Sequence, residues 1–270
     1  MAEMHRKSER LKGLLKEYGS VAVAFSGGVD STFLLKVAHD VLEEKCVAVT
    51  VRTSIFPKRE IAEAEAFCRN GNIRQLMVEG GGLSVEGFSV NAPDRCYICK
   101  LALFKMMLQS AAAEGMSVVC EGSNIDDLDD YRPGLKAVKE LGVQSPLRAC
   151  GLTKREIRLL SAEMGLPTAD KPSFACLASR IPYGERITPE KLGMVEDAED
   201  FLRDFGFRQV RVRIHGDIAR LEVEPDFIMS AAEKREEIVS ALKRMGFGYV
   251  ALDLQGYRTG SMNEKIAAAD

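Results

Sequence analysis

A short stretch near the start of the chain, residues 26–31 with the sequence SGGVDS, combines hydroxyl, carboxylate and glycine groups in a pattern suited to phosphate. It follows an apolar run at residues 21–25, predicted as a strand, and leads directly into a helical pattern. A strand, a glycine turn and a helix N-terminus together aim backbone N–H groups and the positive end of a helix dipole at an anion. We therefore expect a phosphate-binding site here, with hydroxyls from Ser26 and Ser31 and with Asp30 holding a Mg²⁺ that bridges phosphates.

Gly27 and Gly28 let phosphate oxygens approach the backbone of this loop, because neither carries a Cβ and both tolerate positive φ. A lone Gly-Gly pair before a helix is more often an ordinary turn, so the prediction depends on the whole string. The string is not a Walker loop, which needs G-x-x-x-x-G-K-[ST], and it is not a Rossmann fingerprint, which needs G-x-G-x-x-G.

A second polar string, EGSNIDD at residues 121–127, follows another predicted strand at residues 117–120. Open parallel sheets bind their ligands at the carboxyl ends of the strands. We therefore expect this string at the ligand-binding edge of the sheet. It is similar to the G-[ST]-N-x-x-D stretch of amidating and sulfur-transferring ATP enzymes, which implies that Gly122 and Asn124, together with Arg132 a little further on, lie near a nucleotide. The alternative is an Asx turn that caps the next helix, which is a common use of Asn and Asp in loops.

Cys96 and Cys99 form a C-x-x-C motif at a predicted helix start, beside Arg95 and Lys100. The helix dipole and the neighbouring cations both favour thiolate at this place. Two thiols do not complete a zinc or iron–sulfur site, so a third ligand has to come from elsewhere, and Cys176 is the candidate. The pattern alone leaves a metal, a cluster and a redox pair open, and for Cys176 also simple packing.

The other cysteines form no recognisable site. The chain has seven cysteines, an odd number, which argues against a disulfide framework. Cys46 and Cys120 lie in predicted buried strands and Cys68 lies on the apolar face of a predicted helix, so we expect these three in the core. Cys150 precedes a turn, and the sequence assigns it no role.

The elements that position these groups alternate between strand and helix from about residue 19 to residue 142. Further strands are predicted at residues 46–51 and 75–78, each preceded by a helical pattern, which indicates a doubly wound α/β domain with a parallel sheet. A T-x-x-E capping box at residues 153–156 predicts a later helix. We expect this domain to cover residues 1–186.

Residues 187–270 are expected to form a smaller α+β domain, because the pattern changes after a turn-rich stretch. Its predicted elements are a helix from Thr188, strands at residues 209–214 and 218–223, a helix rich in Glu and Lys, and a last strand at residues 249–254.

Arg211 and Arg213 stand two residues apart in the first of these strands and therefore project from one strand face. Paired guanidinium groups suit bidentate recognition of a phosphate or a carboxylate. Glu222 and Glu224, which share one face of the next strand, either bind a metal or pair with these arginines, and Glu199 and Asp253 are weaker candidates for a metal ligand. A solvated charged face of the sheet is the competing explanation.

The composition restricts the class of function. The formal net charge is −3, so there is no general basic surplus that would suit long nucleic acids. No apolar run is long enough to span a bilayer, and the first residues suggest an amphipathic helix rather than a signal peptide. We therefore expect a cytoplasmic protein that binds neither membranes nor nucleic acids.

The SGGVDS string resembles the PP-loop of the ATP pyrophosphatase superfamily, which implies a nucleotide α-hydrolase-like fold and adenylation of a substrate with release of pyrophosphate. Five longer strings resemble the LarE family of sulfur transferases, which make the nickel-pincer nucleotide of lactate racemase: PDRCYICK, EGSNIDDLDDYRPG, PLRACGLTKREIR, KPSFACLASRIPYG and VRVRIHGDIARLEV. The resemblance implies a pyridinium mononucleotide substrate whose two carboxylates are adenylated and converted to thiocarboxylates. It also implies that Arg211 and Arg213 hold the substrate phosphate and that the protein is a homo-oligomer, a hexamer.

Two sulfur chemistries occur in that family. In one, a cysteine matching Cys176 gives up its own sulfur and becomes dehydroalanine. In the other, three cysteines bind a [4Fe-4S] cluster that carries an extra sulfide from a sulfide donor. Because Cys96 and Cys99 accompany Cys176, the thiol count and the resemblance together favour the cluster type, with Arg180 stabilising the developing negative charge.

Two further functions remain as alternatives. One is a PP-loop tRNA thiolase, and the other is a nucleotide-binding regulatory module without turnover. The absence of a long basic stretch argues against the thiolase, since binding to RNA needs phosphate-neutralising charge. The intact acidic and cysteine groups argue against the module.

Overall fold

The computed structural model describes residues 1–129, 134–173 and 175–258, and its chain divides into two compact units. The first unit comprises Met1–Val85 and Asp94–Phe174, and the second comprises Glu86–Pro93 and Ala175–Asp270. This division lies before the boundary predicted at residue 186, and it assigns a short segment from the first half of the chain to the second unit.

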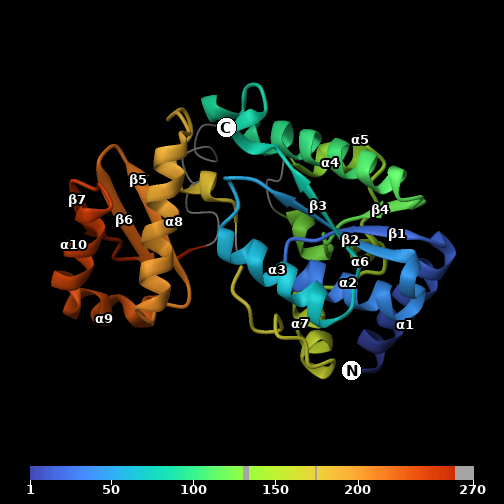
Figure 1. Ribbon diagram of the computed structural model, residues 1–270. Helices are drawn as coiled ribbons and strands as arrows, with labels where there is room; N and C mark the ends of the chain where they lie inside the picture. The colour runs from blue at the N-terminus through green and yellow to red at the C-terminus, as the bar shows by residue number, and fades with distance from the viewer. Residues whose placement is uncertain (130–133, 174, 259–270) are drawn as a thin grey trace. The chain divides into compact units, whose positions relative to one another are not determined.

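The first unit is built around a four-stranded parallel sheet, shown in Figure 1. Its strands are β1 (Val21–Ala24), β2 (Cys46–Arg52), β3 (Gln75–Glu79) and β4 (Val118–Cys120), in the spatial order β3-β2-β1-β4. Each predicted strand is confirmed with one boundary moved by one residue. All of β2 except its last residue is buried, as expected for a parallel strand with helices on both faces.

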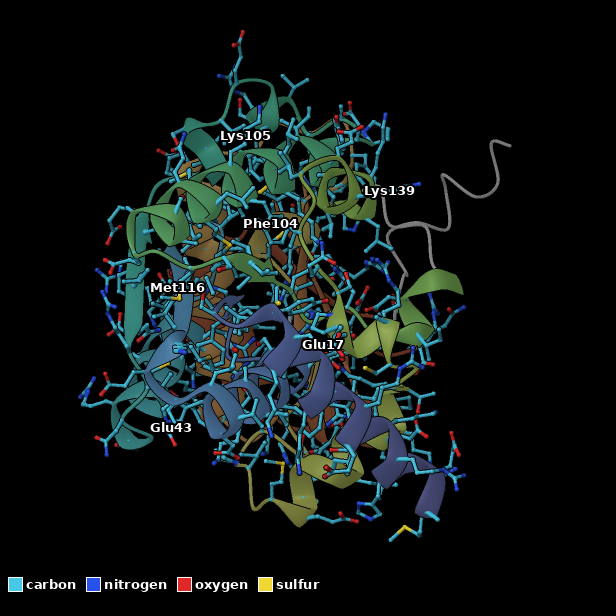
Figure 2. The ribbon with its side chains drawn as sticks, turned by 90° about the vertical axis from the view of Figure 1, so that its right-hand side faces the viewer. Glu17, Glu43, Phe104, Lys105, Met116 and Lys139 are labelled. Atoms are coloured by element: carbon cyan, nitrogen blue, oxygen red, sulfur yellow. The ribbon has the colours of Figure 1, made fainter. Side chains whose placement is uncertain are left out.

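Helices cover both faces of this sheet, which confirms the predicted doubly wound α/β class (Figure 1). The helices of this unit are α1 (Ala2–Tyr18), α2 (Val29–Leu42), α3 (Lys58–Asn70), α4 (Arg95–Ala113), α5 (Gly134–Glu140), α6 (Pro146–Ala149) and α7 (Lys154–Glu163). Side chains of α1, α2, α3 and α7 share one apolar core with the sheet, and α4 and α5 lie together on the other face. In Figure 2, Phe104 of α4 lies toward the interior, whereas Lys105 beside it and Lys139 of α5 point outward.

The second unit is a small α+β fold with a three-stranded sheet in the order β5-β6-β7. Its elements are α8 (Pro189–Asp204), β5 (Val210–His215), β6 (Ile218–Val223), α9 (Ile228–Glu233), α10 (Arg235–Arg244) and β7 (Tyr249–Leu252). β5 and β6 are antiparallel, while β6 and β7 are parallel. The single helix predicted from the Glu- and Lys-rich stretch is in fact two, separated at Lys234, whose ammonium lies 4.8 Å from the centroid of the Phe205 ring.

None of the helices in the described ranges is both long enough and apolar enough to cross a membrane.

Candidate active site

The loop between β1 and α2 has the geometry of a phosphate-binding turn. Gly27 has a φ of 73°, a conformation that favours glycine, and a Cβ at this residue would lie 3.3 Å from the Cβ of Ala64. The hydroxyls of Ser26 and Ser31 are 3.2 Å apart, and Ser31 Oγ donates to the carbonyl of Gly28 at 3.1 Å. Gly28 is the N-cap residue of α2 and has no side chain with which to cap the helix, so the N–H groups of the first turn suit an anion.

The segment after β4 contacts this loop. Asn124 Nδ2 donates to Asp30 Oδ1 at 3.2 Å. A Cβ at Gly122 would lie 3.1 Å from the backbone nitrogen of Ser31, so the two segments approach each other closely. Asn124 Oδ1 also accepts from the N–H of Asp126 at 2.9 Å, which is the Asx turn that stood as the alternative. The Asn124 side chain therefore contacts the loop through its nitrogen and forms the Asx turn through its oxygen.

Two lysines that the sequence analysis did not single out contact the same loop. Lys154, the first residue of α7, donates through Nζ to Asp30 Oδ2. Lys171 Nζ donates to the carbonyl of Gly27 at 3.0 Å and forms an ion pair with Glu60 at 2.7 Å. The predicted capping box at the start of α7 is present, and it fixes the position from which Lys154 extends. Both lysines lie within strings that resemble the LarE family, Lys154 in PLRACGLTKREIR and Lys171 at the start of KPSFACLASRIPYG, but neither was assigned a role from the sequence.

Cys96 and Cys99 lie in the first turns of α4, on one side of the helix because they are three residues apart. A Cβ at Gly81, just after β3, would collide with Leu103, so the end of that strand lies beside the middle of α4. The helix extends about 10 Å further toward Cys96, past the carboxyl edge of the sheet. Cys99 is 8% exposed and Cys96 is partly exposed. Two thiols at a helix N-terminus suit one side of an iron–sulfur cluster.

Cys176 belongs to the second unit, where it precedes the short 3₁₀ helix η5 (Leu177–Arg180), and it is partly exposed. Its carbonyl accepts hydrogen bonds from Ser179 N at 3.0 Å, from Ser179 Oγ at 2.8 Å and from Arg180 Nη1 at 2.9 Å. Over residues 1–129, 134–173 and 175–258, no three His, Cys, Asp or Glu side chains form a group that could hold a metal ion. The site of three thiols therefore stays a prediction.

Arg180 lies behind the Cys176 segment and is 0% exposed. Its Nε and Nη2 each donate to one carboxylate oxygen of Glu199 at 2.7 Å. Its Nη1 donates to the carbonyls of Ala175 at 2.7 Å and of Cys176 at 2.9 Å. All three nitrogens of this guanidinium are thus bonded to groups of the protein itself.

Glu199 on α8 is also 0% exposed and accepts further hydrogen bonds, from Arg203 at 2.9 Å and from the N–H of Val212 at 3.0 Å. Burial alone would raise the pKa of the Glu199 carboxyl. The attraction and hydrogen bonds of Arg180, with further attraction from Arg211 and Arg203, together outweigh burial and lower that pKa to about 2. Glu199 is therefore the negatively charged member of a buried ion-pair network with Arg180 and Arg203.

Arg211 and Arg213 project from one face of β5, opposite Glu222 and Arg220 on β6. They are 3% and 5% exposed, so the alternative of a solvated charged face is wrong. Arg213 donates to Glu222 Oε2 from Nε at 3.0 Å and from Nη2 at 2.7 Å, and Arg220 lies 3.1 Å from the other oxygen. Arg213 Nη1 also donates to the carbonyl of Ser179 at 3.1 Å, which joins this face to the segment that carries Cys176.

The buried guanidinium of Arg211 donates from Nη1 to the carbonyl of Val210 at 2.9 Å. Its guanidinium lies 5.2 Å from the centroid of the Tyr257 ring. Burial lowers the pKa of Arg211 to about 10, and repulsion from Arg180 adds to that effect.

The remaining residues singled out from the sequence are Arg132 and four cysteines. Arg132 lies outside the described residues. Cys46, Cys68 and Cys120 lie in the core as predicted, and burial raises the pKa of the Cys46 and Cys68 thiols to about 12 and also raises that of Cys120. Cys150, which the sequence left unassigned, is 2% exposed in the same core, so packing accounts for it.

Comparison with known proteins relates the whole chain to one family. No protein-family profile matches the chain. An uncharacterized protein of Synechocystis sp. is 41% identical over 266 residues, which cover 97% of this chain and 99% of that protein. The pyridinium-3,5-bisthiocarboxylic acid mononucleotide synthase of Lactiplantibacillus plantarum is 36% identical over 272 residues, which cover 100% of this chain and 98% of the synthase.

A weaker similarity extends to other ATP-using enzymes with a PP-loop. A GMP synthase of Brucella melitensis is 25% identical over 224 residues, which cover 73% of this chain and 43% of that enzyme. Since the longer match spans both units, the chain belongs to the LarE-type pyridinium-3,5-bisthiocarboxylic acid mononucleotide synthase family within the PP-loop superfamily.

Proposed function

We propose that the protein is an ATP-dependent sulfur transferase that converts the carboxylates of pyridinium-3,5-biscarboxylic acid mononucleotide to thiocarboxylates for nickel-pincer nucleotide synthesis. The observation that carries the proposal is the phosphate-binding turn at Gly27 and Gly28, in a chain that matches a bisthiocarboxylic acid synthase over its full length. The same match favours this substrate over the tRNA of a thiolase.

The first step is adenylation, and the first unit contains the groups for it. The loop at residues 26–31 and the N-terminus of α2 bind the triphosphate of ATP. Asp30 would hold a Mg²⁺ that bridges the phosphates, and Lys154, which pairs with Asp30 in this structure, is placed to donate to the same phosphates. A substrate carboxylate oxygen then attacks the α-phosphorus, pyrophosphate leaves, and the carbonyl carbon carries AMP as a good leaving group.

The second unit holds the substrate and the sulfur-handling cysteine. Arg211 and Arg213 bind the phosphate of the pyridinium mononucleotide, which offsets the cost of burying their charges. The segment of Cys176 is hydrogen-bonded to Arg213 through Ser179, so substrate binding and the cysteine share one hydrogen-bonded network.

Sulfur delivery is assigned to the three predicted thiols. Cys96, Cys99 and Cys176 would hold a [4Fe-4S] cluster, which when bound supplies a sulfide nucleophile for the adenylated carboxylate. The helix N-terminus at Cys96 and Cys99 favours their thiolate form as ligands. We extend the proposal to a cytoplasmic homo-hexamer that takes its sulfide from a separate donor.

Anaerobic purification followed by measurement of iron, sulfide and turnover tests the cluster. The wild type should be brown, contain iron and transfer sulfur over several turnovers. Cys96→Ala should lose both iron and multiple turnover, whereas Cys68→Ala, which changes a core cysteine, should keep both. Unchanged turnover in Cys96→Ala would refute the cluster role. A colourless wild type whose Cys176 becomes dehydroalanine after one turnover would instead establish the sacrificial route.

A further inference from the structure

The ion pair of Arg180 and Glu199 is fully buried directly behind the segment that carries Cys176. Both side chains are 0% exposed, and the pair is bidentate, with two contacts of 2.7 Å. A buried ion pair adds little net stability compared with apolar residues of the same size, because the cost of desolvation offsets the attraction. Its geometry therefore calls for an explanation other than stability.

The ion pair connects α8, β5 and η5 to the backbone carbonyls of Ala175 and Cys176. Glu199 comes from α8 and also accepts from the N–H of Val212 on β5, so the carboxylate is fixed by two elements. Arg180 uses two nitrogens on this carboxylate and its third on the carbonyls of Ala175 and Cys176. Only the planar fork of a guanidinium presents donors in both directions at once, because a lysine has a single nitrogen.

Cys176 needs such support because no regular element holds its backbone. It precedes η5 with a φ of −56° and a ψ of 147°, outside the helical region. Its carbonyl accepts from Arg180 and from Ser179, and the neighbouring carbonyl of Ala175 also accepts from Arg180. Two successive carbonyls turned toward one buried guanidinium fix the direction of the chain at Cys176.

We propose that Arg180 and Glu199 are positioning residues that hold the Cys176 backbone in the orientation required for sulfur transfer. The inference rests on the proposed function, which makes Cys176 a sulfur-handling cysteine. It replaces the role expected for Arg180 from the sequence, since a guanidinium bonded through all three nitrogens to the protein acts on the reaction through Cys176 rather than on the developing charge.

The test compares Arg180→Lys with Arg203→Lys in the full-length protein. Both variants keep the charge and both weaken a hydrogen bond to Glu199, but only Arg180 also bonds the Cys176 segment. Hydrogen exchange of the peptide covering residues 175–181 reports local opening. Substrate-dependent exchange of pyrophosphate into ATP reports adenylation, and thiocarboxylate formation reports sulfur transfer.

In Arg180→Lys, exchange in residues 175–181 should accelerate by at least about tenfold, as expected when two hydrogen bonds of ordinary net strength are lost. The kcat of sulfur transfer should fall by a similar factor, while pyrophosphate exchange stays at the wild-type rate. Arg203→Lys should match the wild type in all three measurements. Glu199→Asp keeps the charge but shortens the side chain. It should give the same three results as Arg180→Lys, and it replaces Arg180→Lys as the test variant if that protein does not fold.

Unchanged hydrogen exchange and unchanged kcat in Arg180→Lys would overturn the inference, and so would an equal loss in Arg203→Lys. If the wild type itself transferred no sulfur, the proposed function would fail. Hydrogen exchange would still decide whether Arg180 holds the Cys176 segment.

Discussion

At the scale of single residues, the phosphate loop depends on one backbone conformation. Gly27 adopts a φ of 73°, and its carbonyl accepts from Lys171. A side chain at this position is strained and also meets Ala64 on α3. The loop at residues 26–31 can therefore keep this conformation only with glycine at residue 27, and the proposed phosphate site depends on it.

Gly27→Ala should lower the free energy of unfolding by about 1 kcal/mol, the cost of placing a non-glycine residue in the left-handed region, and it should abolish pyrophosphate exchange. Gly193→Ala is the matched control, because Gly193 lies inside α8 with nothing within 4 Å of an added Cβ. The control should be at least as stable as the wild type and fully active. Urea denaturation and the exchange assay measure both effects, and an active Gly27→Ala variant would remove the loop from the mechanism.

Lys154 should matter for ATP because it pairs with Asp30 and lies within reach of the proposed phosphate site. Lys154→Met should raise the KM for ATP by about tenfold or more, since a charge-assisted hydrogen bond contributes about 1.5–3 kcal/mol. Lys36→Met, further along α2 and paired with Asp40, should leave that KM unchanged. Equal KM values for the two variants would show that Lys154 pairs with Asp30 but does not bind the phosphates of ATP.

At the scale of elements, the start of α7 connects stability to the site. Thr153 and Glu156 form the predicted capping box, and the next residue after the cap is Lys154. Thr188 caps α8 in the second unit through a hydrogen bond to the N–H of Lys191 at 3.3 Å. The sequence predicted the capping box at Thr153 and a helix start at Thr188, because both signals depend on residues close together in the chain.

Thr153→Ala and Thr188→Ala should each cost about 1 kcal/mol of stability, the usual effect of losing an N-cap. Only Thr153→Ala should also raise the KM for ATP, because it frees the turn from which Lys154 extends. Thermal unfolding and steady-state kinetics of the two variants measure this difference. A rise in KM of the same size in Thr188→Ala would contradict the assignment of ATP binding to the first unit.

The junction of α8, β5 and the Cys176 segment should make stability depend on acid pH. Because the pKa of Glu199 is lowered to about 2 from an ordinary value of 4.5, its charged form stabilises the folded state above pH 4.5. That contribution, about 3 kcal/mol by linkage, should disappear as the pH falls from 4.5 toward 2. The difference in unfolding free energy between the wild type and Glu199→Gln should shrink over this range, and a difference independent of pH would contradict the lowered pKa.

At the scale of the whole molecule, the sequence predicts the elements far better than the contacts between them. The four strands of the first sheet follow from apolar runs with helical patterns between them, which are local signals. The pairing of Arg180 with Glu199 joins residues 19 apart, and that of Lys171 with Gly27 joins residues 144 apart. No short-range pattern encodes such contacts. The sequence therefore named Arg180 and Glu199 separately and for other roles, and only the structure shows that they pair.

The division into units shows the same limit. Segment 86–93 joins the second unit, although the chain on either side belongs to the first. Asn91, at a φ of 63° and 0% exposed, donates through Nδ2 to the carbonyls of Pro182 at 2.7 Å and Glu185 at 3.0 Å. One buried amide thus ties two distant segments together, and in the sequence it is an asparagine in an ordinary loop.

The most direct test of the proposed function is a product analysis by mass spectrometry. Anaerobic protein is incubated with MgATP, a sulfide source and pyridinium-3,5-biscarboxylic acid mononucleotide. The account predicts that carboxylate oxygens are replaced by sulfur, with one AMP and one pyrophosphate released for each replacement. Release of ADP and phosphate, or AMP formation without any thiocarboxylate while the substrate is present, would contradict it.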